Sequence, residues 1–166
     1  ALESVGIGEV FVAAIRAIEE KDEQWLDRLF ALAAAVPEVQ PGLISAFGWI
    51  SAQHLHGIGA GLLASQNLLK KQVGIAACVS HRVDPGMVLT SLINHQQPQL
   101  RACALRAAGE LGRCDLRSAC ERSLTDKEVA CRFWAAWSAV LLGNRTSAVE
   151  ALKVYSMTIN SFQEQA

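Results

Sequence analysis

Four histidines and five cysteines are the nitrogen and sulfur ligands that this chain could offer to a metal ion. His54 and His56 are two positions apart, which places them on different sides of a helix, where they cannot readily chelate one ion. The chain has no C-x-x-C and no H-E-x-x-H motif, and the six-residue spacing of Cys114 and Cys120 also separates those two side chains. We therefore expect no metal site and no bound cofactor.

Nucleophilic catalysis is disfavoured on similar grounds. There is no G-x-S-x-G motif, and no local pattern pairs a cysteine with a histidine and an orienting carboxylate. Carboxylates such as Glu110, Asp115 and Glu121 occur where helices usually present solvated faces. We expect that the protein is not an enzyme.

A glycine-rich segment, His56–Gly61, invites comparison with phosphate-binding loops. Its pattern is G-x-G-x-G instead of G-x-G-x-x-G, and no β-strand is expected before it. A phosphate loop requires a strand-to-helix turn that directs backbone N–H groups at the anion. We interpret the segment as a helix surface of small residues that permits close packing.

Three cations, Lys70, Arg101 and Arg132, are spaced 31 residues apart, and we call them the cationic row. In stacked repeats such positions lie about 10 Å apart, so the row could bind an acidic peptide or a phosphate backbone. The alternative is intramolecular: each cation could bind loop carbonyls or carboxylates of a neighbouring repeat.

The segment Val129–Leu142 is apolar on all sides of a predicted helix, with Arg132 as its one charged residue. Phe133 and Trp137, four positions apart, share a side. A helix without a polar face is expected to be buried or to contact a partner. The sequence leaves both readings open, and Phe133 and Trp137 join the cationic row as candidate partner-binding residues.

These candidates lie in a repeat of about 30 residues, whose copies begin near Leu68, Pro98 and Glu128. Pro98 suits a first helical turn, and Gly112 suits the left-handed position after a helix end. The segment Thr125–Glu128 resembles a capping box for the next helix. Small residues recur in register through the copies: Val73, Ala104 and Ala135; Ala77, Ala108 and Ala139; Gly112 and Gly143.

Each repeat is predicted to be a helical hairpin. Shorter helices are expected in MVLTSLINH, LRSACERSL and SAVEALKVYSM, between the longer ones. A single hairpin cannot bury its apolar side, so neighbours must stack. The N-terminal part is expected to continue the pattern with helices near Ile7–Glu20, Glu23–Val36, Leu43–Ser51 and Gln53–Ala64.

Composition limits the class of protein. The 166 residues suit one domain, and the net charge of −1 gives no field that attracts nucleic acid or an anionic membrane. No stretch predicts a membrane span or a signal peptide, and an odd number of cysteines suits a reducing compartment. We expect a cytoplasmic location. The first residue is alanine, which suggests processing or a piece of a longer protein.

The segments PQLRACALRAAGELGRCDLRSACERSL and EVACRFWAAWSAVLLGNRTSAVEAL resemble HEAT repeats of the short bacterial type. The resemblance covers roughly residues 43–157 and is clearest over 68–157. VGIAACVSHRVDPG and CRFWAAWSAVLLGN are similar to a bacterial HEAT-like family of unassigned function, reminiscent of accessory proteins encoded near contractile secretion machinery. The resemblance implies an all-α, right-handed α-solenoid of about five hairpins over residues 1–166. It supplies no catalytic residue.

From these patterns we predict a non-catalytic scaffold or adaptor that binds another protein or peptide, in a secretion system or another multiprotein assembly. Membrane contact is not expected. Two alternatives come from the same resemblance: a nucleic-acid-binding protein similar to HEAT-like glycosylases, which the near-neutral charge disfavours, and a small-molecule enzyme similar to HEAT-containing bilin lyases.

Overall fold

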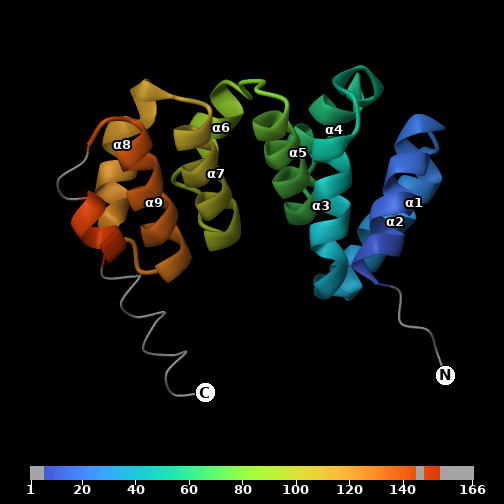
Figure 1. Ribbon diagram of the computed structural model, residues 1–166, viewed down its shortest axis with the longest axis horizontal. Helices are drawn as coiled ribbons and strands as arrows, with labels where there is room; N and C mark the ends of the chain where they lie inside the picture. The colour runs from blue at the N-terminus through green and yellow to red at the C-terminus, as the bar shows by residue number, and fades with distance from the viewer. Residues whose placement is uncertain (1–5, 145–147, 154–166) are drawn as a thin grey trace, which may run out of the picture. The chain divides into compact units, whose positions relative to one another are not determined.

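A computed structural model describes residues 6–144 and 148–153 of the chain. Over these residues the protein is helical and contains no β-strand, which confirms the all-α prediction (Figure 1). The chain divides into two compact units, unit 1 (Ala1–Val83) and unit 2 (Asp84–Ala166). No described helix is long and apolar enough to cross a membrane. A continuous right-handed superhelix of about five hairpins stays a prediction.

Unit 1 contains five α-helices and two short 3₁₀ helices over its described residues. Asp22 caps one helix by accepting a hydrogen bond from the Trp25 N–H at 2.9 Å, and Asn67 caps another through the Lys70 N–H at 3.1 Å. The elements are α1 (Ile7–Glu19), α2 (Glu23–Ala35), η1 (Pro37–Val39), α3 (Gln40–Trp49), η2 (Ala52–Leu55), α4 (Ile58–Ala64) and α5 (Leu68–Ser80).

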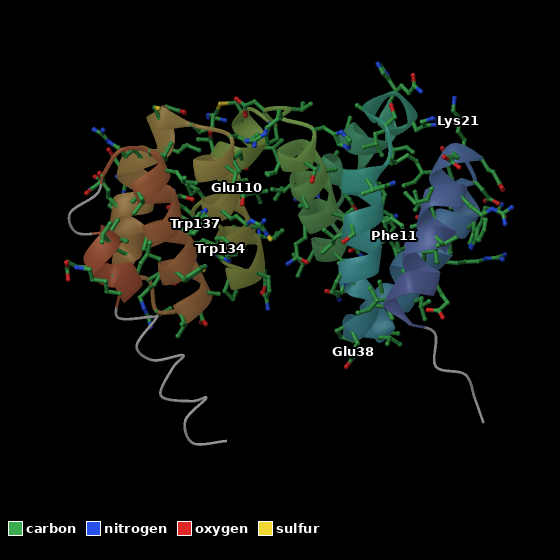
Figure 2. The ribbon with its side chains drawn as sticks, in the orientation of Figure 1. Phe11, Lys21, Glu38, Glu110, Trp134 and Trp137 are labelled. Carbon is green, nitrogen blue, oxygen red and sulfur yellow. The ribbon has the colours of Figure 1, made fainter. Side chains whose placement is uncertain are left out.

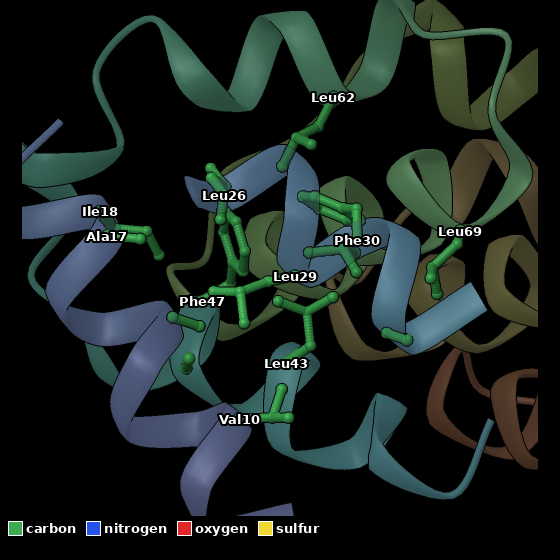
Figure 3. Packing of buried hydrophobic residues seen from close by; sticks show 14 of the residues in the cluster. Val10, Ala17, Ile18, Leu26, Leu29, Phe30, Leu43, Phe47, Leu62 and Leu69 are labelled. Atoms are coloured by element: carbon green, nitrogen blue, oxygen red, sulfur yellow. The ribbon is translucent and has the colours of Figure 1, made fainter. Parts of the chain in front are cut away.

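The core of unit 1 is formed where α1, α2, α3 and α5 meet (Figure 3). Phe30 of α2 and Phe47 of α3 pack with their ring centroids 6.0 Å apart. Ile18 and Leu43 are fully buried beside them. Each such side chain contributes roughly 1.5–3 kcal/mol of burial free energy, so this apolar cluster holds the helices of the unit together.

The predicted single helix over Gln53–Ala64 is wrong in one respect. Gly57 adopts φ +85°, and the chain there forms η2 and then the short α4 instead of one continuous helix. A positive φ is readily adopted by glycine and costly for other residues. Sequence periodicity could not reveal this break, because the segment around Gly57 mixes histidines, glycines and single apolar residues without a clear helical pattern.

Unit 2 contains α6 (Met87–Leu92), α7 (Pro98–Glu110), η3 (Cys114–Leu116), α8 (Arg117–Arg122), η4 (Ser123–Thr125) and α9 (Val129–Leu141), and residues 148–153 are also helical. Pro98 opens α7, as predicted. Gly112 and Gly143 have φ +69° and +98°, as expected after a helix end. The remaining residues of the predicted SAVEALKVYSM helix lie outside the described residues.

Helices α7 and α9 pack closely through small residues. The Ser138 hydroxyl of α9 donates to the Leu105 carbonyl of α7 at 2.6 Å, and the Cys131 thiol donates to the Pro98 carbonyl at 3.4 Å. A Cβ atom added to Gly109 would lie 2.6 Å from the Ser138 Cα atom. This approach of two backbones therefore requires a glycine at position 109.

The predicted capping box at Thr125–Glu128 is also wrong. Helix α9 begins at Val129, and its cap residue Glu128 makes no side-chain capping hydrogen bond. Thr125 belongs to η4, where its hydroxyl donates to the Arg122 carbonyl. The carboxylate of Asp126 accepts the Glu128 N–H at 2.9 Å and organises the loop before α9.

Candidate interaction surface

One side of α9 is apolar and open to solvent. Val129, Trp137 and Leu141 are 58%, 42% and 52% exposed, and Phe133 is half-buried. These four residues are spaced four apart, so they form one continuous stripe along the helix, which we call the α9 stripe. The opposite side of α9 is buried through Cys131, Ala135, Ser138 and Ala139. The prediction of a buried helix is therefore confirmed for one side of α9, and contact with a partner stays a prediction for the exposed side.

Three aromatic rings are clustered at the stripe. Trp134 meets Phe133 edge to face with centroids 4.9 Å apart and meets Trp137 in the same way at 6.4 Å. Such pairs contribute about 0.5–1.5 kcal/mol beyond their burial. The cluster therefore holds the Trp137 ring in a defined orientation while a large part of it stays exposed.

Two charged side chains of the neighbouring helix α7 lie along one edge of this aromatic cluster. The Arg106 guanidinium lies 4.8 Å from the centre of the Trp134 ring, and its Nε donates to Glu110 at 2.8 Å. Figure 2 labels Trp134 and Trp137 on α9 and Glu110 on α7. The surface thus combines an uncharged stripe with an ion pair along one edge.

Arg101, a member of the cationic row, is directed into unit 2. Its side chain is 10% exposed and makes a bidentate ion pair with Asp126, at 2.7 and 2.9 Å. Its Nη1 also donates to the carbonyls of His95 and Gln96. The hydrogen bond from Arg101 lowers the pKa of the Asp126 carboxyl, and the same bond raises the pKa of Arg101. Arg101 offers little surface to a partner.

The other two cations of the row also bind their own chain. Arg132 donates through Nη1 to the carbonyls of Asp126 and Lys127. In unit 1, Lys70 donates to the Asp27 carboxylate at 2.6 Å and lies 5.4 Å from the Phe30 ring centre. These contacts match the intramolecular alternative stated for the row.

The structure brings Arg101 and Arg132 to the same loop, since both bind Asp126, and it places Phe133 and Trp137 on one side of α9. Arg106 and Glu110, which border this surface, were not among the predicted site residues. The 31-residue offset of the sequence could have identified them, because position 106 aligns with position 137 and position 110 aligns with position 141. The aligned pairs are Arg106 with Trp137 and Glu110 with Leu141.

The described cysteines and histidines do not gather into a cluster of metal ligands. No group of three or more His, Cys, Asp or Glu residues within residues 6–144 and 148–153 could hold a metal ion. Burial raises the pKa of Cys120 to about 11 and also raises the pKa values of Cys103 and Cys131. These three thiols therefore stay protonated at neutral pH, when they are poor nucleophiles.

Comparisons of the chain with protein-family models, with curated proteins and with solved structures find no match. The likeness to HEAT repeats therefore depends on the sequence segments quoted above and stays a prediction.

Proposed function

We propose that this protein is a non-catalytic scaffold or adaptor that docks an amphipathic helix of a partner protein on the α9 stripe. The observation that supports this most directly is the exposure of Trp137 and Leu141 on a helix side that carries no charge. Exposed apolar patches bordered by polar residues are typical of interaction sites, and tryptophan is enriched among the residues that dominate binding energy.

The stripe suits a helical partner. It runs along a helix of 13 residues, which is about 20 Å of straight apolar surface. A partner helix with apolar residues at three- and four-residue spacing would cover it side by side. Because α9 is anchored on α7 through Ser138 and Gly109, little ordering entropy is lost when the partner binds.

The Arg106–Glu110 pair gives the surface an orientation. Its two charges lie on one edge of the aromatic cluster, so a partner with complementary charges at matching positions would bind in one register. Nucleic-acid binding is less well supported, because the three cations of the row bind groups of their own chain. We further propose a cytoplasmic location, because an odd number of cysteines suits a reducing compartment. The sequence resemblance supports a role in a bacterial secretion system or a similar assembly.

The experiment is an affinity pull-down of the tagged full-length protein from its native cells. Wild type is compared with the double variant Trp137→Gln/Leu141→Gln and with Met87→Gln, a matched control at a residue of unit 2 that is 79% exposed. We expect a stoichiometric partner with wild type and the Met87 variant, and its loss with the double variant.

Melting temperatures of all three proteins and their masses by light scattering complete the design. A partner retained equally by wild type and both variants would overturn the proposal. A wild-type dimer that dissociates in the double variant would show that the occupant of the stripe is a second copy of this chain.

A further inference from the structure

A shallow cleft of about 620 Å³ lies in unit 2, between the loop before α7 and the segment before α9. Three cations, Arg101, Arg122 and Lys127, line it together with a single carboxylate, Asp126. Amide and hydroxyl side chains complete its wall. The cleft therefore has an excess of positive charge, although the whole chain carries a formal charge of −1.

The one carboxylate in the cleft is already fully engaged. Oδ2 of Asp126 accepts from Arg101, and Oδ1 accepts from both Arg101 and the Glu128 N–H. Arg101 and Asp126 thus neutralise each other. Arg122 and Lys127 have no carboxylate within 4.0 Å among the described residues, so their charges remain available to a ligand.

His95 adds a hydrogen-bond donor to this wall. Its Nδ1 accepts the Gln97 N–H at 3.1 Å, so in the neutral ring the proton resides on Nε2, which can donate. Donors therefore outnumber free acceptors in the cleft. A ligand that fits this arrangement is an oxyanion with several acceptor oxygens.

We propose that this cleft binds the carboxylates of an acidic peptide segment, through Arg122 and Lys127. Arg101 and Asp126 already form a bidentate ion pair in this cleft, which shows that a carboxylate group fits there. Two available cations are too few for strong binding of a nucleic-acid backbone, which requires many phosphate contacts. The inference depends on the proposed function only for the source of the peptide, a protein partner.

The test is a titration of the ¹⁵N-labelled full-length protein with a blocked hexaglutamate peptide, followed by NMR at low salt. Hexaglutamine, inorganic phosphate and a single-stranded DNA oligonucleotide are the comparison ligands. We expect hexaglutamate to shift the amide signals of residues 94–96 and 122–127, with an affinity that falls as salt is added.

Two charge-reversal variants give the matched control. Arg122→Glu/Lys127→Glu removes the available cations of the cleft, and Arg28→Glu/Lys71→Glu makes the same change in net charge within unit 1. We expect binding to weaken at least roughly tenfold in the first variant and to stay near wild type in the second.

Equal weakening in both variants, no shifts at the cleft, or a preference for phosphate or DNA over hexaglutamate would each overturn the inference. The result is independent of the pull-down, because the Trp137→Gln/Leu141→Gln variant keeps the cleft and is expected to bind hexaglutamate normally. Failure of one proposal is therefore distinguishable from failure of the other.

Discussion

Helices α7 and α9 align with each other at the 31-residue offset of the sequence, yet their exposed sides have opposite character. Each has 13 residues, and each buries a side rich in alanine. Towards solvent, α7 presents the ion pair of Arg106 and Glu110, whereas α9 presents Trp137 and Leu141 at the aligned positions. The buried sides of the two helices are alike, whereas the outer side of α7 is charged and the outer side of α9 is apolar.

This difference shows that the buried positions of the two helices serve helix packing, whereas the outer positions are available for other interactions. Close packing of the two helices requires small residues such as Gly109 and Ser138 where they touch. Larger residues at these positions are expected to destabilise the fold. The outer positions make few such contacts, so they are free to vary. An exposed tryptophan and leucine increase the risk of aggregation, and we attribute their presence to partner binding.

The largest expected effect concerns the two aligned arginines. Arg101→Ala removes one partner of a buried ion pair and leaves the Asp126 carboxylate without its guanidinium, so it should lower the free energy of unfolding by about 3–5 kcal/mol. Arg132→Ala loses hydrogen bonds to two loop carbonyls and should cost about 1 kcal/mol. Urea unfolding of both variants measures the difference, and equal losses would contradict it.

The same pair should respond to acid. Because Arg101 lowers the pKa of Asp126 in the folded state, the pair contributes stability at pH values above the usual aspartate pKa of 3.8, and this contribution is lost as the pH falls through the lowered value. Asp126→Asn should therefore flatten the acid limb of a plot of stability against pH. An unchanged acid limb would show that the pair does not carry this dependence.

The next largest effect tests the close approach of α7 and α9. Gly109→Ala should destabilise unit 2 by roughly 1–3 kcal/mol, because the new Cβ would lie 2.6 Å from the Ser138 Cα atom. Gly61→Ala in α4 is the control, since its Cβ would meet nothing within 4 Å and should stabilise the helix by up to about 1 kcal/mol. Thermal melting measures the stability of both variants. Stabilisation by both substitutions would contradict the close approach of α7 and α9 at Gly109.

A third prediction transfers the outer side of α7 onto α9. Trp137→Arg/Leu141→Glu should cost about 1–2 kcal/mol of stability, because Trp137 is 42% exposed and loses only part of its burial. It should nevertheless abolish partner capture. Thermal melts followed by circular dichroism measure the loss of stability, and pull-downs measure partner capture. A partner that stays bound would contradict the role in binding that we assign to Trp137 and Leu141.

The smallest effect concerns the charged edge. Glu110→Gln should cost about 0.3–0.5 kcal/mol, as for other solvent-accessible pairs on one helix. Arg106→Gln should cost somewhat more, because it also removes the cation–π contact with Trp134, which is worth about 0.5–1 kcal/mol. Denaturant titrations of the two variants measure both losses, and a loss below about 0.5 kcal/mol for Arg106→Gln would exclude a contribution from the ring contact.

Much of the fold could be predicted because helix formation depends on local patterns. Apolar spacing predicted the main helices, and Pro98, Gly112 and Gly143 marked ends that the structure confirms. The break at Gly57 and the role of Asp126 were missed. Both depend on how distant segments pack, since Asp126 binds Arg101 from 25 residues away instead of capping its own helix.

The site was predicted only in part for a related reason. The sequence identified Phe133, Trp137 and the cationic row, but exposure is a property of the packed structure. An arginine buried against a carboxylate, such as Arg101, and an exposed one, such as Arg106, look the same in sequence. Comparison of aligned repeat positions was the one signal that could have separated the inner side of α9 from its stripe.

The most direct test of the central claim is photo-crosslinking in native cells from position 141. A photoreactive phenylalanine analogue replaces Leu141 on the stripe, and the same analogue at Met87, a more exposed position of unit 2, is the control. If the α9 stripe binds a partner, we expect one dominant adduct with another protein from position 141 and none of that mass from position 87. The same adducts from both positions, or none from position 141, would contradict it.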